Sequence, residues 1–283
     1  MSWRLTRRSA LAAGAAVSLI GATRADPRRI VSLNPCLDAV LVHVADRGQI
    51  TALSHYSHSL ASSSLGELGL RYPFTYGTAE EVLALAPDLV LSGRLVAPAT
   101  QAALNRLGIP VALFGAPDSL SASLAQVAEV ARVVNRPARG AALEARIRAA
   151  IEAAKPAPRS PRLTALIYQS GGFAVARGTL MDEMMTLAGF ENAASRYGLT
   201  RTGHVPLENL IADPPDVLLA AQGEPGEPTW ADRVLTHPAL IKVAHRMHRV
   251  AFPQQLTFCG GPVLIATAAM LARARIETLE ARG

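Results

Sequence analysis

One phrase occurs twice in this sequence, and it constrains the fold more than any other feature. Residues 80–91 are EEVLALAPDLVL and residues 208–219 are ENLIADPPDVLL, and aligning the two Pro-Asp pairs places Glu80 on Glu208. Each copy predicts a short helix, a proline that ends it, and an apolar strand suited to a parallel sheet covered on both faces. The repeat therefore predicts two similar α/β lobes that face a shared cleft, where small ligands commonly bind. Chance recurrence is the alternative, and the matched glutamates argue against it.

Composition is compatible with two lobes and argues against a nucleic-acid partner. The 283 residues are 50% hydrophobic, which is enough for one large core or two of ordinary size. The net charge is +6, but residues 1–25 contain four arginines and no acid, which leaves +2 for the rest. A balance so close to neutral lacks the positive field of a nucleic-acid-binding protein.

Residues 1–25 have the pattern of an export signal. A basic segment precedes a small apolar run at 11–22, and Ala25 offers a small residue for cleavage. The run is too short and too rich in Ala and Gly for a membrane span. The pair Arg7 and Arg8 resembles a twin-arginine signal, and an ordinary secretory signal is the alternative. Both routes predict a mature protein in a bacterial periplasm.

Strands alternate with helices in the first half, which predicts a parallel α/β lobe. There we expect strands at 29–34, 50–53, 89–91 and 110–114, and helices at 36–45, 98–107 and 119–134. In the second half we expect strands at 163–168, 173–176, 217–219 and 248–251, and helices at 180–188 and 261–281. The last helix would begin at Gly261-Pro262, with proline at its favoured first position.

A long helix is predicted between the two halves. Residues 138–154 are rich in Ala, Glu and Arg, which are strong helix formers, and would span about 25 Å. Asn135 is a plausible cap for this helix, and the proline-rich segment 155–161 is a stiff connector. We therefore expect an N-terminal lobe at 27–134, a linker helix and connector at 135–159, and a C-terminal lobe at 160–283.

The sequence contains no catalytic motif: GxSxG, HExxH, a Walker loop and a post-strand GxGxxG are all absent. We expect no enzyme activity and no cofactor of the protein's own. His55 and His58 have a His-x-x-His spacing and are weak metal candidates, because a metal cage needs further ligands such as His204. A solvated or ligand-facing loop is the favoured interpretation of this segment.

Three aromatic residues fall in predicted loops beside strand ends, although aromatics form only 5% of the chain: Tyr56, Tyr76 and Phe173. Flat rings offer a large contact area at a low entropy cost, which suits a flat or macrocyclic ligand. Packing at the base of each loop is the equal alternative for each residue taken alone.

The order of several segments resembles the periplasmic binding proteins of ABC importers for cobalamin, ferric siderophores and haem. The resemblance covers residues 28–283 and rests on RRIVSLNP, SHYSHS, both copies of the repeat, the helical linker and RGTLMDEMMTLAGFENAA. It implies an α/β fold of two Rossmann-like lobes, joined by a long linker helix, with the ligand clamped in the cleft between them.

The resemblance also implies a function. The protein would be a monomer that captures a cobalt or iron chelate and delivers it to a permease with an ATPase on its cytoplasmic side. A corrinoid such as cobalamin is the first choice of ligand and a ferric siderophore the second. A haem or bare transition-metal carrier that uses His55, His58 or Cys36 is the alternative, and an exported enzyme on a similar scaffold is the rival from another class.

By the same resemblance, Glu80 and Glu208 match glutamates that dock on arginines of the permease, where charge pairing would set the orientation. The alternative is that both are acids favoured at helix N-termini by the helix dipole. Tyr56, Tyr76 and Phe173 fall on or near cleft aromatics of cobalamin binders, and the segment around His204 replaces another.

The resemblance places Asn34 and Cys36 at the cleft from the first lobe, and Cys259 from the second. The loop around Cys259 departs from cobalamin binders, because it carries a thiol and two glycines where charged or bulky groups are common. Three roles stay open for the cysteines: a disulfide, which an oxidising compartment permits, contact with a chelate, or burial as small residues. A disulfide between lobes would lock the cleft, which argues against the first.

Overall fold

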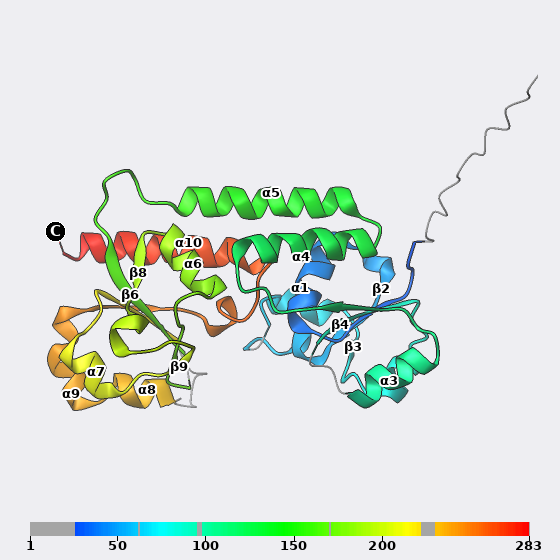
Figure 1. Ribbon diagram of the computed structural model, residues 1–283, viewed down its shortest axis with the longest axis horizontal. Helices are drawn as coiled ribbons and strands as arrows, with labels where there is room; N and C mark the ends of the chain where they lie inside the picture. The colour runs from blue at the N-terminus through cyan, green and yellow to red at the C-terminus, as the bar shows by residue number, and fades with distance from the viewer. Residues whose placement is uncertain (1–25, 62, 95–97, 170, 222–229, 283) are drawn as a thin grey trace, which may run out of the picture.

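The computed structural model describes residues 26–61, 63–94, 98–169, 171–221 and 230–282 (Figure 1). The predicted export signal at residues 1–25 lies outside this part of the chain. Two α/β lobes lie side by side beneath a layer of long helices (Figure 1). The predicted fold of two lobes joined by a long helix is confirmed.

The N-terminal lobe is built on a five-stranded sheet in the order β3-β2-β1-β4-β5, and every neighbouring pair in it is parallel. Its strands are β1 (Ile30–Ser32), β2 (Ile50–Ser54), β3 (Phe74–Thr75), β4 (Leu89–Gly93) and β5 (Val111–Phe114). Its helices are α1 (Pro35–Val44), α2 (Ala79–Ala84), α3 (Pro98–Arg106) and α4 (Leu120–Val133), with 3₁₀ turns η1 (Arg47–Gln49), η2 (His55–His58) and η3 (Gly66–Arg71).

The C-terminal lobe has a mixed sheet in the order β11-β10-β6-β7-β9, and β8 pairs with β6. Its strands are β6 (Leu163–Tyr168), β7 (Phe173–Ala174), β8 (Phe190–Asn192), β9 (Gly203–His204), β10 (Val217–Ala220) and β11 (His248–Ala251). Its helices are α6 (Leu180–Leu187), α7 (Leu207–Ala212), α8 (Trp230–Leu235), α9 (Pro238–Val243) and α10 (Val263–Glu280), with η4 (Ala193–Tyr197), η5 (Ala244–Arg246) and η6 (Gln254–Leu256). Strand β7 runs antiparallel to β6, because a turn with Gly172 at φ +78° reverses the chain, and it also pairs antiparallel with β9.

The linker helix α5 (Pro137–Ala154) lies along α4 and α10 and spans both lobes (Figure 1). It buries Leu143, Ile147 and Ile151 in a core cluster that includes residues of α1, α4, α6 and α10. A Cβ at Gly140 would lie 2.5 Å from the Ala131 Cβ, so this glycine allows α5 to approach α4 closely. Because one core underlies both lobes at the helix side, they cannot separate there without exposing apolar surface.

The prediction that Asn135 caps this helix is wrong. Arg136 occupies the N-cap position and makes no side-chain cap bond, while Asn135 has a left-handed φ of +57°. The residue before a proline is disfavoured in helical conformation, so Pro137 places the boundary at Arg136. The Arg136 guanidinium instead pairs with Asp46 at 2.6 Å and with Asp26 at 3.0 Å.

The repeated Pro-Asp pair ties neighbouring strands together. In the first copy the Asp88 carboxylate accepts the backbone N–H groups of Arg28 and Arg29, just before β1. In the second copy the Asp216 carboxylate accepts both the backbone N–H and the hydroxyl of Thr164 in β6. The repeated aspartate therefore sets the pairing of β4 with β1 and of β10 with β6.

Candidate ligand-binding cleft

A pocket of about 550 Å³ lies between the two lobes. The first lobe lines it with Asn34, Cys36, Leu37, Gly93, Arg94, residues 114–118 and Gln126; the second lobe lines it with Gln169, Val175, residues 178–181, Thr202 and residues 257–260. Several of these positions directly follow β1, β4, β5 and β6. Ligands of open α/β sheets bind in the crevice outside the carboxyl ends of the strands, and the pocket has that location.

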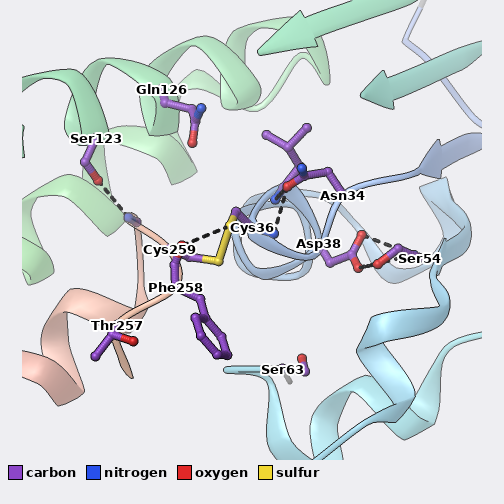
Figure 2. The surroundings of a disulfide bond; sticks show 12 residues. Asn34, Cys36, Asp38, Ser54, Ser63, Ser123, Gln126, Thr257, Phe258 and Cys259 are labelled. Atoms are coloured by element: carbon purple, nitrogen blue, oxygen red, sulfur yellow. Dashed lines mark hydrogen bonds between the residues drawn. A yellow bond between two sulfur atoms is a disulfide. The ribbon is translucent and has the colours of Figure 1, made fainter. Parts of the chain in front are cut away.

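A disulfide joins the lobes at this pocket. Cys36 in the first turn of α1 is bonded to Cys259 just before α10, with a Cα–Cα distance of 5.2 Å and a sequence separation of 223 (Figure 2). Of the three roles left open for the cysteines, the structure has the disulfide. The expectation that a locked cleft argues against a disulfide is wrong. Helix α10 already packs along α5, so the disulfide joins parts of the two lobes that the shared core holds together without it.

The two glycines after Cys259 allow its loop to approach the first lobe. A Cβ at Gly260 would lie 2.4 Å from the Ser123 Oγ of α4, and Gly261 has a left-handed φ of +71°. The Gly261 N–H donates to the Ser123 Oγ at 2.7 Å (Figure 2). The departure of this loop from the cobalamin binders thus has a structural reason, since a bulky residue here would clash with α4.

Three carboxamide side chains line the pocket. The Asn34 Oδ1 accepts from Cys36 N at 2.9 Å and Leu37 N at 3.3 Å, which caps α1 (Figure 2). Gln126 donates to the Gly115 carbonyl at 2.7 Å, and Gln169 donates to the Thr257 hydroxyl at 3.0 Å. These bonds fix each amide, so the pocket presents oriented polar groups that need little reorganisation on binding.

The described lining is close to neutral in charge. Its ionisable side chains are Arg94, which follows β4, and Asp118, which precedes α4. Their charges are opposite, and the remaining lining residues are apolar, hydroxyl or amide groups. This composition favours a ligand of low net charge over a polyanion, because unpaired charges cost free energy when water is removed.

The predicted aromatic residues do not line this pocket. In the first lobe, the His55 ring lies 4.0 Å from the Tyr56 ring and 5.1 Å from the Tyr76 ring, between centroids. Tyr56 is 45% exposed and Tyr76 is 66% exposed. In the second lobe, Phe173 and His204 face each other across β7 and β9, with centroids 3.9 Å apart. Strands β3 and β9 lie on the side of the lobes away from α5 (Figure 1).

The two loop histidines have partners within the first lobe. His58 Nε2 lies 2.8 Å from the Tyr72 carbonyl oxygen, and its ring packs against Phe74. The His55 ring stacks on Tyr76. Among the described residues, no group of three or more His, Cys, Asp or Glu side chains is arranged to hold a metal ion. The weak metal candidates therefore come with no further ligands in this part of the chain.

Glu80 and Glu208 occupy the first turns of α2 and α7. Both side chains are exposed, and neither forms an ion pair with another described residue. The positions leave them accessible to a partner and also favourable for the helix dipole, so both interpretations of these acids fit their geometry.

A buried acid near the disulfide has no counterpart in the sequence-based predictions. Asp38 in α1 is fully buried and accepts hydrogen bonds from the Ser54 N–H and hydroxyl of β2 (Figure 2). Burial raises the pKa of its carboxyl to about 7, against the opposing effect of hydrogen bonds from Ser32 and Ser54. Asp38 thus connects α1 to β2 directly behind Cys36.

Sequence patterns missed other lining residues. Arg94 and Gln169 follow β4 and β6, so the rule that ligands bind at strand ends would have found them. Gln126 lies within α4 and has no local signal. Phe258 is exposed beside Cys259 and points away from α4 (Figure 2), and only the pairing of the cysteines identifies its place.

Comparison with known proteins agrees with this architecture. The model of the family "Periplasmic binding protein" matches residues 30–252. The chain belongs to this family. A curated relative, the cobalamin-binding protein of Halobacterium salinarum, is 27% identical over 198 residues, which are 69% of this chain and 54% of the relative. The chain thus spans about half the length of the curated relatives it matches.

Solved periplasmic binding proteins share the fold over almost their whole length. The periplasmic haem-binding protein RhuT from Roseiflexus sp. RS-1, in apo form, is similar with a TM-score of 0.69 and 24% identity, over 90% of this chain and 99% of RhuT. The periplasmic vitamin B12-binding protein BtuF of Vibrio cholerae is similar with a TM-score of 0.63 and 14% identity, over 91% of this chain and 98% of BtuF.

Proposed function

We propose that this chain is the periplasmic substrate-binding component of an ABC importer, which captures a metal chelate and delivers it to a membrane permease. The observation that carries the proposal is a pocket at the junction of the two lobes, lined from both, in a chain of the periplasmic binding protein family. The homologues are binding proteins, which supports a carrier over an enzyme.

A corrinoid is the ligand that the pocket favours, with a ferric siderophore second. A corrin ring carries carboxamide side chains, and these can exchange hydrogen bonds with Asn34, Gln126 and Gln169. The near-neutral lining suits a corrinoid better than a polyanionic ferric complex. A corrinoid is larger than the pocket, so the remainder would lie against the exposed rings of Tyr56, Tyr76 and Phe173.

Haem is the alternative to these two ligands, and the exposed imidazole of His204 is the observation that favours it. The His204 ring packs against Phe173 in the second lobe, tilted by 34°, and a ring nitrogen of histidine can ligate iron. Cys36 offers no thiolate to a metal while it is bonded to Cys259. A bare-metal carrier that uses Cys36 is therefore restricted to the reduced protein.

Delivery to a permease would use the exposed Glu80 and Glu208, one on each lobe. Charge pairing at two separated points would set the docking orientation and speed association. No helix in the described part of the chain is long and apolar enough to cross a membrane. Export through the predicted signal at residues 1–25 would deliver the chain as a periplasmic monomer.

The test is a titration of residues 26–283 with cyanocobalamin, dicyanocobinamide, haemin and ferric siderophores, followed by protein fluorescence and ligand absorbance. We expect saturable one-to-one binding of a corrinoid, weakened roughly tenfold by Tyr76→Ala or Phe173→Ala, since buried aromatic contacts dominate such interfaces. Leu107→Ala is the control, because Leu107 is exposed at the end of α3.

The haem alternative makes a different prediction. Haemin would bind in preference to corrinoids, and His204→Ala would change the absorbance spectrum of bound haemin by removing an iron ligand. If no corrinoid, haemin or ferric siderophore binds to protein that circular dichroism shows to be folded, the chelate-carrier proposal is wrong.

A further inference from the structure

The repeat extends beyond its two glutamates to one exposed ring in each lobe. The offset of 128 positions that places Glu80 on Glu208 also places Tyr76 on His204. Each of these rings is exposed and lies four positions before the matching glutamate. In both lobes, one short segment therefore connects a ring proposed to touch ligand with an acid proposed to touch the permease.

In the first lobe a single carboxylate holds this segment. Glu81 Oε2 accepts a hydrogen bond from the Thr75 hydroxyl at 2.7 Å and another from the Tyr76 N–H at 2.7 Å. Thr75 is buried at the end of β3, and its Oγ1 also accepts from the Gly77 N–H at 3.0 Å. The hydroxyl bond from Thr75 lowers the Glu81 pKa, so this carboxylate is ionised at neutral pH.

The start of helix α2 fixes Glu81 in turn. The Thr78 Oγ1 accepts the Glu81 N–H at 3.2 Å and caps the helix. The Gly77 carbonyl accepts from the Thr100 hydroxyl of α3 at 3.0 Å. The backbone of Tyr76 is therefore held on both sides, while its ring packs against the rings of His55 and Phe74.

The second lobe lacks this arrangement. Asn209 takes the place of Glu81, and within the described residues its side chain makes no hydrogen bond. His204 is held instead by the pairing of β9 with β7 and by the contact of its ring with Phe173. The two rings thus occupy matching positions, but only Tyr76 depends on a side-chain carboxylate for its backbone position.

We propose that Glu81 is a positioning residue for ligand binding, which fixes Tyr76 in the orientation that contacts the ligand. The inference rests on the proposed function. A ring on a freely moving loop would lose conformational entropy on binding, and the bonds from Thr75 and Tyr76 to Glu81 remove that cost in advance. The neighbouring Glu80 has no such role, because its side chain is exposed and makes no hydrogen bond to Thr75 or Tyr76.

The test compares Glu81→Ala and Glu81→Gln with Tyr76→Ala and the double variant Glu81→Ala/Tyr76→Ala, in the chain of residues 26–283. Glu129→Ala is the matched control, since this carboxylate also pairs within its own lobe, with Arg132 on α4, and its pKa is also lowered by that partner. The first readout needs no ligand: amide hydrogen exchange at Tyr76, measured by NMR. Loss of the acceptor should speed it about tenfold, with no change in the control.

The second readout is affinity for cyanocobalamin. Glu81→Ala should weaken binding roughly threefold to tenfold, and Glu81→Gln should recover part of the loss because its amide oxygen can still accept. In the Tyr76→Ala background, Glu81→Ala should have no further effect, since residues that act through one contact are not additive. An equal loss in both backgrounds would show that Glu81 does not act through Tyr76.

The two readouts separate this inference from the proposed function. If wild-type protein binds no chelate, the carrier proposal is wrong. The hydrogen-exchange measurement then tests by itself whether Glu81 holds Tyr76 in position. Unchanged exchange at Tyr76 in Glu81→Ala would overturn the positioning role whether or not a ligand binds. Faster exchange, with unchanged exchange in the core strand β1, supports it and excludes general unfolding.

Discussion

The aspartate at the matching position of the repeat is more buried and has more interactions in the C-terminal lobe than in the N-terminal lobe. Asp88 in the N-terminal lobe is exposed and accepts from two backbone N–H groups. Asp216 in the C-terminal lobe is partly buried, accepts two bonds from Thr164 and pairs with Arg282 at 2.7 Å. The repeated sequence therefore specifies the strand pairing in both lobes. How much each aspartate stabilises its lobe depends on its burial and on the hydrogen-bond and ion-pair partners that the lobe provides.

The two rings at matching positions of the repeat, Tyr76 and His204, differ in the same way. Tyr76 stands in a loop of the all-parallel lobe and is held through a carboxylate, whereas His204 stands in a strand of the mixed sheet and is held by backbone pairing. A strand pair is a rigid support, and a loop held by one side chain is easily altered. A substitution that removes one side-chain hydrogen bond should therefore alter the position of Tyr76 more than that of His204.

The bond that joins the lobes gives the largest expected effect. Replacing both Cys36 and Cys259 with serine should lower the free energy of unfolding by about 5 kcal/mol, because the disulfide closes a very long loop and restricts the unfolded chain. The check is urea unfolding followed by tryptophan and tyrosine fluorescence and by circular dichroism. With the bond removed, a difference in stability between the lobes would appear as two transitions instead of one.

Two controls accompany this measurement. Wild-type protein in reductant should behave as the double variant does, and reductant should not change the double variant further. A loss below about 1 kcal/mol in both would show that the shared helical core holds the lobes together without the disulfide.

The stability of the two lobes should depend on pH in opposite ways, because each contains an acid whose pKa is shifted in a different direction. Burial raises the pKa of Asp38 in the N-terminal lobe to about 7. Protonated Asp38 therefore favours the folded state. This contribution to the free energy of unfolding is complete below a pH of about 4, which is the pKa of an aspartate in the unfolded chain, and is lost as the pH rises towards 7. Asp38→Asn keeps a neutral group, so it should flatten this slope and stabilise the protein above pH 7 by up to about 4 kcal/mol.

Asp216→Asn in the C-terminal lobe is the matched control. Partial burial raises the Asp216 pKa, but hydrogen bonds from Thr164 and Arg282 outweigh it, so the pKa lies below the usual value. Its stabilisation is present at neutral pH and is lost as pH falls below about 4. Thermal unfolding between pH 3 and pH 8 should therefore give slopes of opposite sign for the two carboxyls. Parallel slopes in the two variants would contradict the assignment of Asp38.

The parts of the structure that the sequence predicts have long local patterns, and the parts that it does not predict are short or depend on a neighbouring residue. The repeat and the long apolar patterns predict the two lobes, and residues 163–168 and 248–251 form strands with the expected bounds. Periodicity predicts none of β3, β8, β9, α8 and α9, because each is too short to show a period. Asn135 fails as a cap because the steric effect of the following Arg136-Pro137 pair decides where the helix begins.

The candidate site shows the same division. Asn34 follows a predicted strand, so its place at the cleft could be expected from the rule for strand ends. The disulfide of Cys36 with Cys259 depends on how α10 packs against the first lobe, 223 positions away in sequence. Gln126 reaches the pocket only because α4 turns that face towards the junction. Contacts of this range follow from the packing of whole elements, and no local pattern encodes them.

The two aspartates of the repeat should stabilise the protein by different amounts. Asp216→Ala should destabilise the protein by about 2 kcal/mol, because it leaves the Thr164 N–H and hydroxyl without a charged acceptor and removes the pair with Arg282. Asp88→Ala should cost about 1 kcal/mol, since water can replace the exposed carboxylate at the N–H groups of Arg28 and Arg29. Asp213→Ala, which removes an exposed pair with Arg196, should cost about 0.5 kcal/mol. Urea unfolding at pH 7 ranks the three variants by their free energy of unfolding. If Asp88→Ala and Asp216→Ala lowered it equally, burial and the ion pair with Arg282 would add nothing to the stabilisation that each aspartate gives through strand pairing.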